Sequence, residues 1–220
     1  MLSDLIKLFF PEICSGCGTV LSKTENGICS SCMIELKQFK NSFKKKYFGR
    51  VKIESETYAF EFVKDQIFQQ ILHNIKYKKH KNAAYSLGIE LGKIISLKMN
   101  DIDAIIPIPI SNNKKEKTGY NQCDIIAIGV QEVLNVPILQ DYISRKNKMY
   151  SQKQSDRFQR WKNTENQFHL SGNFDEAMHV LLLDDVVTSG ATIHGCAKLI
   201  EGKIKKISVA ALARSKYEVS

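Results

Sequence analysis

A thirteen-residue stretch, Val180 to Thr192, constrains the fold more than any other feature of the sequence. It begins with four apolar residues, Val180 to Leu183, a run typical of a short strand buried on both faces of a parallel sheet. Asp184 and Asp185 follow directly, where such a strand would emerge. Because open α/β sheets bind ligands at the carboxyl ends of their strands, the two acids are predicted to lie in a ligand site.

The acids lead into a loop of small and hydroxyl-bearing residues, and then into a run with helical spacing: Ile193, Cys196, Leu199 and Ile200. Such a loop aims backbone N–H groups and hydroxyls at one point on the positive end of a helix dipole, which suits a phosphate. The helix end contributes only ~0.3–1 kcal/mol, whereas each charge-assisted hydrogen bond contributes ~1.5–3 kcal/mol, so the converging donors dominate. The plain alternative is a strand–turn–helix unit with two solvated aspartates.

Two carboxylates beside a phosphate cradle suit a ligand that also carries sugar hydroxyls and a divalent cation. Carboxylates accept hydrogen bonds from hydroxyls and hold Mg²⁺ through water, while the loop binds the phosphate. The stretch resembles the motif with which type I phosphoribosyltransferases bind 5-phosphoribosyl 1-diphosphate (PRPP). The resemblance implies Mg²⁺ as a cofactor bound with PRPP, and Asp184 and Asp185 as catalytic acids. It implies these PRPP-binding residues: Asp184, Asp185, Val187, Thr188, Ser189, Gly190, Ala191 and Thr192.

Length and charge set the outer limits. The 220 residues can hold one α/β domain and a small appendage. The net charge of +9 favours polyanionic partners, either phosphates or nucleic acid. No apolar run approaches the ~18 residues of a membrane span. The opening Met1 to Phe10 is short and carries Asp4, unlike a signal peptide, so the protein is expected to be cytoplasmic.

Four of the six cysteines form the motif C-x2-C-x11-C-x2-C: Cys14, Cys17, Cys29 and Cys32. Each pair can present both sulfurs inward, so the spacing predicts a tetrahedral Zn²⁺ site that is structural because no coordination position stays open. Disulfides are the weaker alternative without a secretory signal. The predicted division is a zinc-binding module at residues 1–40 and a phosphoribosyltransferase-like domain at 41–220. Cys123 and Cys196 are expected to be buried apolar residues.

The rest of the chain alternates predicted strands and helices. Strands are expected at 56–63, 104–110 and 205–213, and helices at 66–77, at 83–97 and after Gly119. Residues 37–52 are rich in lysine and are expected to form a solvated connection. The predicted fold class is therefore α/β, an open and mostly parallel sheet flanked by helices, similar to the type I phosphoribosyltransferases, with a small N-terminal four-cysteine zinc module.

Five residues in basic or polar segments are candidates for a diphosphate site or a lid over it: Pro109, Ile110, Lys76, Arg145 and Arg160. Pro109 and Ile110 end a strand above a polar, basic loop that could hold a diphosphate. Lys76 lies at the basic end of a predicted helix, where it either complements the helix dipole or contacts a phosphate or nucleic acid. Arg145 and Arg160 lie in a segment, 141–166, where aromatic residues are interspersed among cations. That segment could stack single-stranded DNA, close as a lid over an anionic substrate, or be a solvated loop with a packed Trp161.

Across nearly the whole chain the sequence resembles the ComF family, whose members join a zinc-binding module to a phosphoribosyltransferase fold. The matching residues are the four cysteines, Ile75–Tyr77, Ile106–Pro109, Gly119–Gln122, Arg145, Gln152, Arg160, Asn163, Phe168 and Asp184–Thr192. The chain departs from the family pattern at Thr118, where Arg is usual, and at Met149, where Thr is common. The change at Thr118 removes one candidate phosphate contact.

The family resemblance implies PRPP binding and a role in DNA uptake during natural transformation, with DNA-uptake proteins as further candidate partners. Three functions remain open: a phosphoribosyltransferase with an unknown acceptor, a non-catalytic PRPP-binding or single-stranded-DNA-handling factor, and a regulator that senses PRPP. Purine-salvage relatives carry an acid where this chain has Thr188, which disfavours a purine acceptor.

Overall fold

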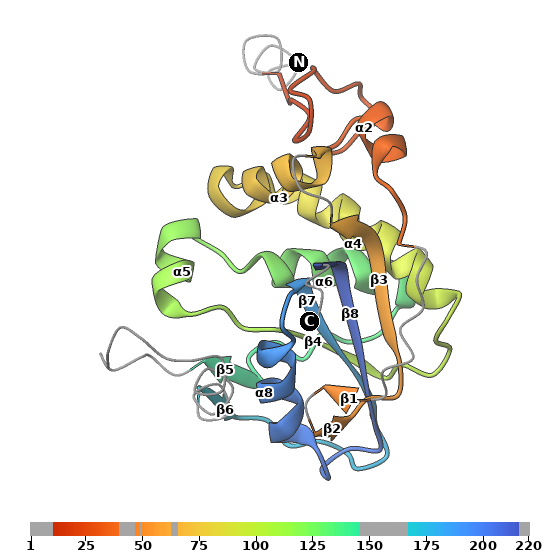
Figure 1. Ribbon diagram of the computed structural model, residues 1–220, viewed down its shortest axis with the longest axis vertical. Helices are drawn as coiled ribbons and strands as arrows, with labels where there is room; N and C mark the ends of the chain where they lie inside the picture. The colour runs from red at the N-terminus through yellow and green to blue at the C-terminus, as the bar shows by residue number, and fades with distance from the viewer. Residues whose placement is uncertain (1–10, 40–46, 49, 63–65, 146–166, 216–220) are drawn as a thin grey trace, which may run out of the picture.

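The computed structural model describes residues 11–39, 47–48, 50–62, 66–145 and 167–215 (Figure 1). Helices and strands alternate along most of this length. Their bounds are α2 Ser30–Glu35, β1 Tyr47–Phe48, β2 Val51–Lys52, β3 Glu56–Phe62, α3 Ile67–Lys78, α4 Lys81–Ser96, β4 Ala104–Pro107, α5 Asn112–Thr118, α6 Gln122–Leu134, β5 Ile143–Arg145, β6 Phe168–Leu170, β7 His179–Val187, α8 Ala191–Ile200 and β8 Lys206–Ser215.

A four-stranded parallel sheet with the strand order β3-β8-β7-β4 forms the centre of the molecule. β7 lies inside the sheet, where Leu182 aligns with Ile106 of β4 on one side and Val209 of β8 on the other. Val180 to Leu183 are completely buried, as a continuous apolar run in a parallel strand requires. The predicted α/β architecture, a parallel sheet flanked by helices, is therefore confirmed.

Helices cover both faces of the sheet (Figure 1). Because side chains alternate along a strand, Leu181 and Leu183 pack into the apolar cluster that also contains residues of α3, α4 and α6. Val180 and Leu182 pack into the opposite cluster, with residues of α8. The two layers place α3 and α6 on one side of the acid pair and α8 on the other.

The N-terminal segment packs on α3 and α4 (Figure 1). Cys14, Cys29 and Cys32 belong to the same buried cluster as Ile71 and Ile75 of α3. Close backbone contact extends to the start of α4, because a Cβ on Gly27 would lie 2.2 Å from the backbone nitrogen of Ala83. The cysteine motif thus shares a core with the helices next to it.

Three local features differ from the expectations. β7 does not end before the acids but continues through Asp184 and Asp185 to Val187, because Asp184, Val186 and Val187 keep their register with β8. The polar segment after Ile110 forms the helix α5, which closes on Gly119 in the left-handed region at φ 79°. Its lysines and glutamate favour helix, and a periodicity search misses it because it has no apolar stripe.

The third difference concerns residues 37–52. The described end of this segment forms the antiparallel hairpin β1–β2, in which Phe48 and Val51 are buried rather than solvated. Both residues belong to the apolar cluster on the α8 side of the sheet.

Within the described ranges, no helix combines the length and the apolar character that crossing a bilayer would demand.

Candidate functional site

The acid pair lies at the carboxyl end of β7, and Asp185 is held there by residues from two helices. The Lys76 Nζ of α3 lies 2.6 Å from Asp185 Oδ2, and Gln122 Nε2 of α6 donates to the same oxygen at 2.9 Å. The other oxygen, Oδ1, accepts from the backbone N–H of Val186 at 2.7 Å. The predicted helix-end lysine and the Gly119–Gln122 motif therefore meet at one carboxylate.

The two acids differ in their electrostatic surroundings. Burial alone would raise the pKa of Asp185, but the Lys76 ammonium and the donated hydrogen bonds outweigh burial and lower that pKa. Burial and the neighbouring Asp185 carboxylate raise the pKa of Asp184 to about 7. Asp185 is thus the fixed anion of the pair, and Asp184 is the member whose charge changes near neutral pH.

The raised pKa of Asp184 predicts a pH-dependent stability. Between its ordinary pKa of 3.8 and about 7, the folded protein holds a proton that the unfolded chain releases, so stability falls as pH rises through this window. We expect Asp184→Asn to flatten that fall. Urea unfolding from pH 4 to pH 8, without PRPP or Mg²⁺, checks the difference between the two proteins. Identical pH profiles would contradict the assignment.

The loop after β7 presents its polar groups outward. The side chains of Thr188 and Ser189 are exposed, whereas Gly190 is buried at φ 76° and caps α8. The first turn of α8 begins at Ala191 and Thr192, so their N–H groups lie at the positive end of the helix. Val187 is the last residue of β7. Its side chain is buried, so only its backbone is available to a ligand. Exposed hydroxyls and helix N–H groups therefore share one end of α8, as the sequence predicted.

Phe48 is a contributor to this loop that the sequence did not indicate. A Cβ on Gly190 would lie 2.6 Å from the Phe48 ring, so the ring fills the space behind the loop. His194 Nδ1 of α8 lies 2.8 Å from the Phe48 backbone oxygen, and the Arg214 guanidinium lies 5.7 Å from the Phe48 ring centre. The only sequence signal for this contact of Phe48 was a short apolar strand inside a lysine-rich segment.

Pro109, Ile110 and Arg145 line one cavity of about 130 Å³ beside the end of β4. The Arg145 guanidinium donates to Gln167 Oε1 at 2.8 Å and lies over the Phe168 ring. Lys115 also lines the cavity, and so do two carboxylates, Asp124 and Asp141. The structure thus brings three of the predicted diphosphate residues together, while Lys76 contacts Asp185 instead. Arg160 lies outside the described residues, as does most of the 141–166 segment.

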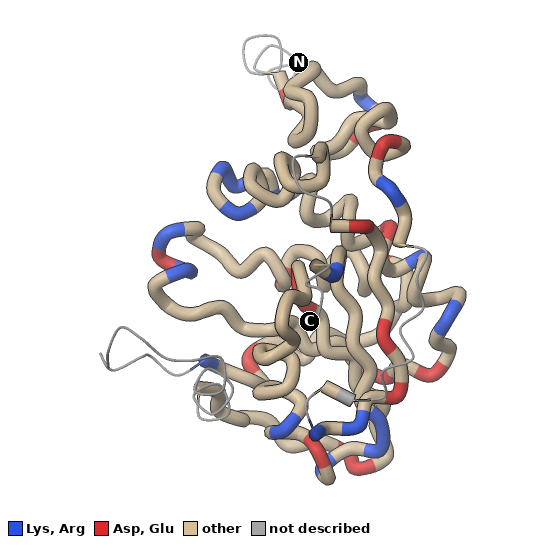
Figure 2. Tube along the Cα trace, in the orientation of Figure 1, with Lys and Arg blue, Asp and Glu red and all other residues tan. Residues whose placement is uncertain are grey.

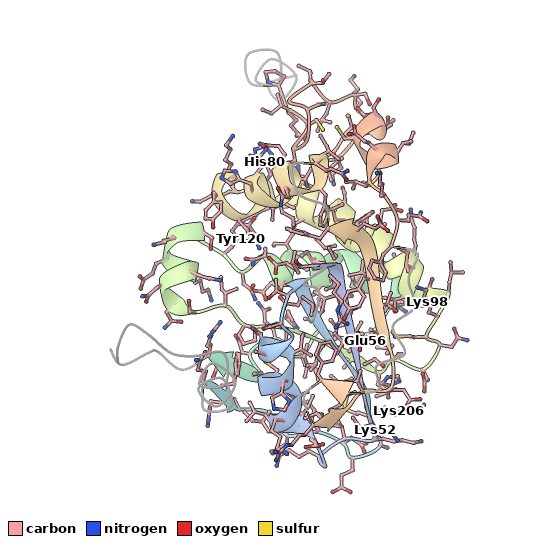
Figure 3. All side chains as sticks on the ribbon, viewed as in Figure 1. Lys52, Glu56, His80, Lys98, Tyr120 and Lys206 are labelled. Atoms are coloured by element: carbon pink, nitrogen blue, oxygen red, sulfur yellow. The ribbon has the colours of Figure 1, made fainter. Side chains whose placement is uncertain are left out.

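Thr118 stabilises the end of α5 through its side chain. Its side chain is buried, and its hydroxyl lies 2.9 Å from the Lys114 carbonyl and 2.6 Å from the Tyr120 carbonyl. The hydroxyl therefore closes the end of α5 and has no free donor for a ligand. Tyr120, two residues on, donates from its hydroxyl to the carbonyl of Ile75 in α3 (Figure 3).

The four predicted zinc ligands converge. Their sulfur atoms all lie within 4.8 Å of one another, with Cys17 Sγ 3.7 Å from Cys29 Sγ. Backbone N–H groups of Gly16 and Cys29 point at Cys14 Sγ from 3.3 and 3.2 Å, an arrangement that stabilises a thiolate. All four are free cysteines. This donor set, four sulfurs around one point, suits a structural Zn²⁺ ion.

Cys123 and Cys196 are buried, in agreement with the expectation. Cys123 Sγ lies 3.7 Å from Asp184 Oδ1, and burial together with the acid pair raises its pKa well above the ordinary value. A thiol kept protonated in this way is a weak hydrogen-bond donor to the acid rather than a nucleophile.

The fold and the two clusters define the class: an α/β protein with a four-stranded parallel sheet, an acid pair and hydroxyl loop at the end of β7, and an N-terminal four-cysteine cluster. Comparison with known proteins shows which proteins this chain is similar to. The chain is 26% identical to Competence protein F of Haemophilus influenzae, over 94% of this chain and 99% of that protein. It is 32% identical to Competence protein ComFC of Bacillus subtilis, over 50% of this chain and 44% of that protein.

Both relatives are competence proteins, and these likenesses agree with the resemblance of the sequence to the ComF family. No family model matches the chain. Among solved structures it is similar to an adenine phosphoribosyltransferase, with 10% identity, a TM-score of 0.41 and coverage of 67% of this chain and 76% of that one. A hypoxanthine phosphoribosyltransferase from Staphylococcus aureus has 10% identity, a TM-score of 0.41 and coverage of 64% and 70%.

Proposed function

We propose that the protein binds PRPP with Mg²⁺ at the end of β7 and transfers its phosphoribosyl group to an acceptor. The observation that carries the proposal is the meeting of three features at one strand end: the acid pair, the exposed hydroxyl loop, and Lys76 at 2.6 Å from Asp185. In this assignment the α8 end and the hydroxyls of Thr188, Ser189 and Thr192 bind the 5-phosphate. Asp184 and Asp185 accept hydrogen bonds from the ribose hydroxyls.

The same residues account for the proposed chemistry. The carboxylates suit Mg²⁺ held through water, and the ion supplies neutralisation of diphosphate charge when it is bound. The acceptor forms a bond to C1 of the ribose as the bond from C1 to the diphosphate oxygen breaks. The chain contributes positioning: Lys76 and Gln122 keep Asp185 fixed, and Arg145 with the Pro109–Ile110 backbone faces the departing diphosphate. Thr188 in place of an acid favours an acceptor other than a purine.

Asp185→Asn is the direct test of the site. The change removes the charge that accepts from ribose and leaves Lys76 without its partner, so we expect PRPP affinity to fall about 10–100-fold, the value of one charge-assisted hydrogen bond. Asp175→Asn, an exposed aspartate before β7, makes the same charge change away from the site and should bind as wild type. Calorimetry with PRPP and Mg²⁺ measures both. Equal affinity of Asp185→Asn and wild type would refute the site assignment.

For the four-cysteine cluster we propose a structural Zn²⁺ ion. Four sulfur donors leave no open coordination position, so the ion holds the module together and takes no part in transfer. Because thiolates persist in a reducing compartment, the proposal includes a cytoplasmic location. We also propose that this zinc-binding module ends near residue 40.

A second candidate function is the handling of single-stranded DNA, and a surface beside the site favours it. Six exposed lysines gather where the end of α3 lies next to α5, here called the α3–α5 lysine surface: Lys78, Lys79, Lys81, Lys114, Lys115 and Lys117 (Figure 2). Tyr77 is 65% exposed beside them, with the His73 ring 5.0 Å away. Glu116 lies within this surface and Glu12 borders Lys79 and Lys81. Cations around an exposed aromatic ring suit backbone phosphates and a stacked base.

DNA binding at this surface predicts a steep salt dependence, with ~0.7 in log K per log salt for each phosphate neutralised. Tyr77→Ala should cost ~1–3 kcal/mol if a base stacks on the ring. The charge reversals Lys115→Glu and Lys117→Glu should abolish binding, whereas Lys203→Glu and Lys205→Glu, beyond α8, should not. Fluorescence anisotropy with a labelled oligonucleotide measures each. No salt-dependent binding by wild type would remove this candidate.

The 141–166 segment is the other predicted DNA site, and Trp161→Ala separates its two interpretations. If a base stacks on the indole, DNA affinity falls by ~1–3 kcal/mol while the melting temperature holds. If the segment is a lid anchored by Trp161, the melting temperature and PRPP affinity fall instead. Trp161 lies outside the described residues, so the variant has to be tested directly.

A further inference from the structure

Three successive residues at the end of α3 contact three different parts of the molecule. The Asn74 side-chain amide donates to the carbonyl of Ser15, between two cysteine-motif residues, at 2.7 Å. The Ile75 carbonyl accepts from the Tyr120 hydroxyl of the Gly119–Gln122 motif. The Lys76 ammonium pairs with Asp185 at 2.6 Å. The four-cysteine cluster, the Gly119–Gln122 motif and the acid pair are thus joined through a single turn of helix.

The contact of Asn74 with the first cysteine knuckle is buried and is reinforced. Asn74 is 6% exposed and Ser15 is completely buried, so water does not replace their hydrogen bond. His80, just beyond α3, lies with Nδ1 2.6 Å from the Ser15 hydroxyl (Figure 3). At the other end of α3, a Cβ on Gly16 would lie 2.9 Å from both Ile67 Cδ1 and Cys32 Sγ. The knuckle therefore packs along the length of the helix.

Lys76 is sensitive to where α3 lies. Its ammonium compensates a buried carboxylate, and its side chain is 31% exposed, so a small displacement of the helix exchanges the ion pair for water. Asp185 would then be left buried with Gln122 and backbone donors but without a cation. Without the Lys76 contact fewer groups fix the orientation of this carboxylate at the strand end, so it is placed less well to accept from ribose hydroxyls.

We propose that Asn74 is a positioning residue for the PRPP site: it ties the Cys14–Gly16 knuckle to the turn of α3 that presents Lys76 to Asp185. The state of the four-cysteine cluster then sets the affinity of a site on the far side of α3. This inference rests on the proposed function, because it concerns PRPP binding by the same acid pair.

The chain offers a matched control. Ser86 Oγ of α4 donates to the Asn26 carbonyl at 2.6 Å, which ties the same N-terminal segment to a helix that carries no predicted site residue. Ser86→Ala therefore removes one tie to the module, as Asn74→Leu does, and leaves α3 in place. A merely structural role of Asn74 would make the two variants alike in every respect except melting temperature.

The experiment uses the full-length, zinc-loaded protein and two readouts. In calorimetry with PRPP and Mg²⁺, Asn74→Leu should bind about fivefold more weakly than wild type, and Ser86→Ala should bind as wild type. The second readout is zinc release to a chromogenic chelator. Since coupling between the binding equilibria of two sites is reciprocal, PRPP should lower the amount of zinc released at equilibrium from wild type and from Ser86→Ala but not from Asn74→Leu. If Asn74→Leu does not fold, Asn74→Ser, which is too short to reach Ser15, carries the same expectations.

Two results would overturn the inference while the proposed function stands: Asn74 variants that bind PRPP like wild type, or equal losses in the Asn74 and Ser86 variants. A wild-type protein that fails to bind PRPP would overturn the proposed function itself. Retained PRPP binding without any effect of PRPP on zinc release from wild type would also refute the coupling.

Discussion

Replacing Gly190 with valine is expected to abolish the proposed PRPP binding. Gly190 sits at φ 76°, a conformation that branched residues avoid, and it directly precedes the first turn of α8. A Cβ at this position would lie 2.6 Å from the Phe48 ring, so the side chain displaces either the ring or the loop. In both cases the N–H groups and hydroxyls proposed to bind the 5-phosphate no longer converge.

Gly202→Val is the matched control for this variant. Gly202 has nearly the same conformation, φ 75°, but nothing lies within 4 Å of an added Cβ, and it is outside the site. Both variants should lose stability, by roughly 1–2 kcal/mol from left-handed strain. Only Gly190→Val should lose PRPP in calorimetry. If Gly202→Val also lost binding, or Gly190→Val kept it, the loop would not be the phosphate site.

Cys14→Ser or Cys29→Ser should remove the bound zinc and disorder the N-terminal module. Binding of structural Zn²⁺ contributes ~10–16 kcal/mol to folding of small four-ligand modules, and one lost thiolate forfeits much of that. We expect PRPP binding to survive in part, because the acid pair and the loop lie on β7 and α8. Zinc content by atomic absorption and protease sensitivity of the N-terminal module check the result.

Cys196→Ser controls for the loss of a buried thiol. Cys196 is completely buried in α8 and belongs to no sulfur cluster among the described residues. This variant should keep its zinc while losing some stability. A wild-type protein purified without metal, or with its four N-terminal cysteines oxidised to disulfides, would contradict the zinc assignment.

Local patterns predicted the parts of this protein that depend on local sequence. The apolar run before Asp184 is a buried strand, and the spacing of Ile193, Cys196 and Ile200 is the buried face of α8. The cysteine spacing predicted that the four sulfurs meet, because two CxxC pairs can supply the four ligands of one tetrahedral site.

Contacts between residues distant in the chain could not be predicted in the same way. Lys76 was expected at a diphosphate or a lid, but the fold places it against Asp185, which is far away in the sequence. Phe48 was hidden in a lysine-rich segment and packs behind Gly190 only because β1–β2 folds onto α8. Helix α5 lacks an apolar stripe, so hydrophobic periodicity gave no sign of it. The roles of Arg160 and of the other residues at 146–166 remain predictions.

Calorimetric titration of the full-length protein with PRPP, with and without Mg²⁺, tests the central claim most directly. The account predicts saturable binding to one site per chain that strengthens with Mg²⁺ and weakens at least about tenfold in Asp185→Asn. Absence of saturable binding by wild type up to about 1 mM PRPP, which corresponds to less than about 4 kcal/mol of binding free energy, would contradict it.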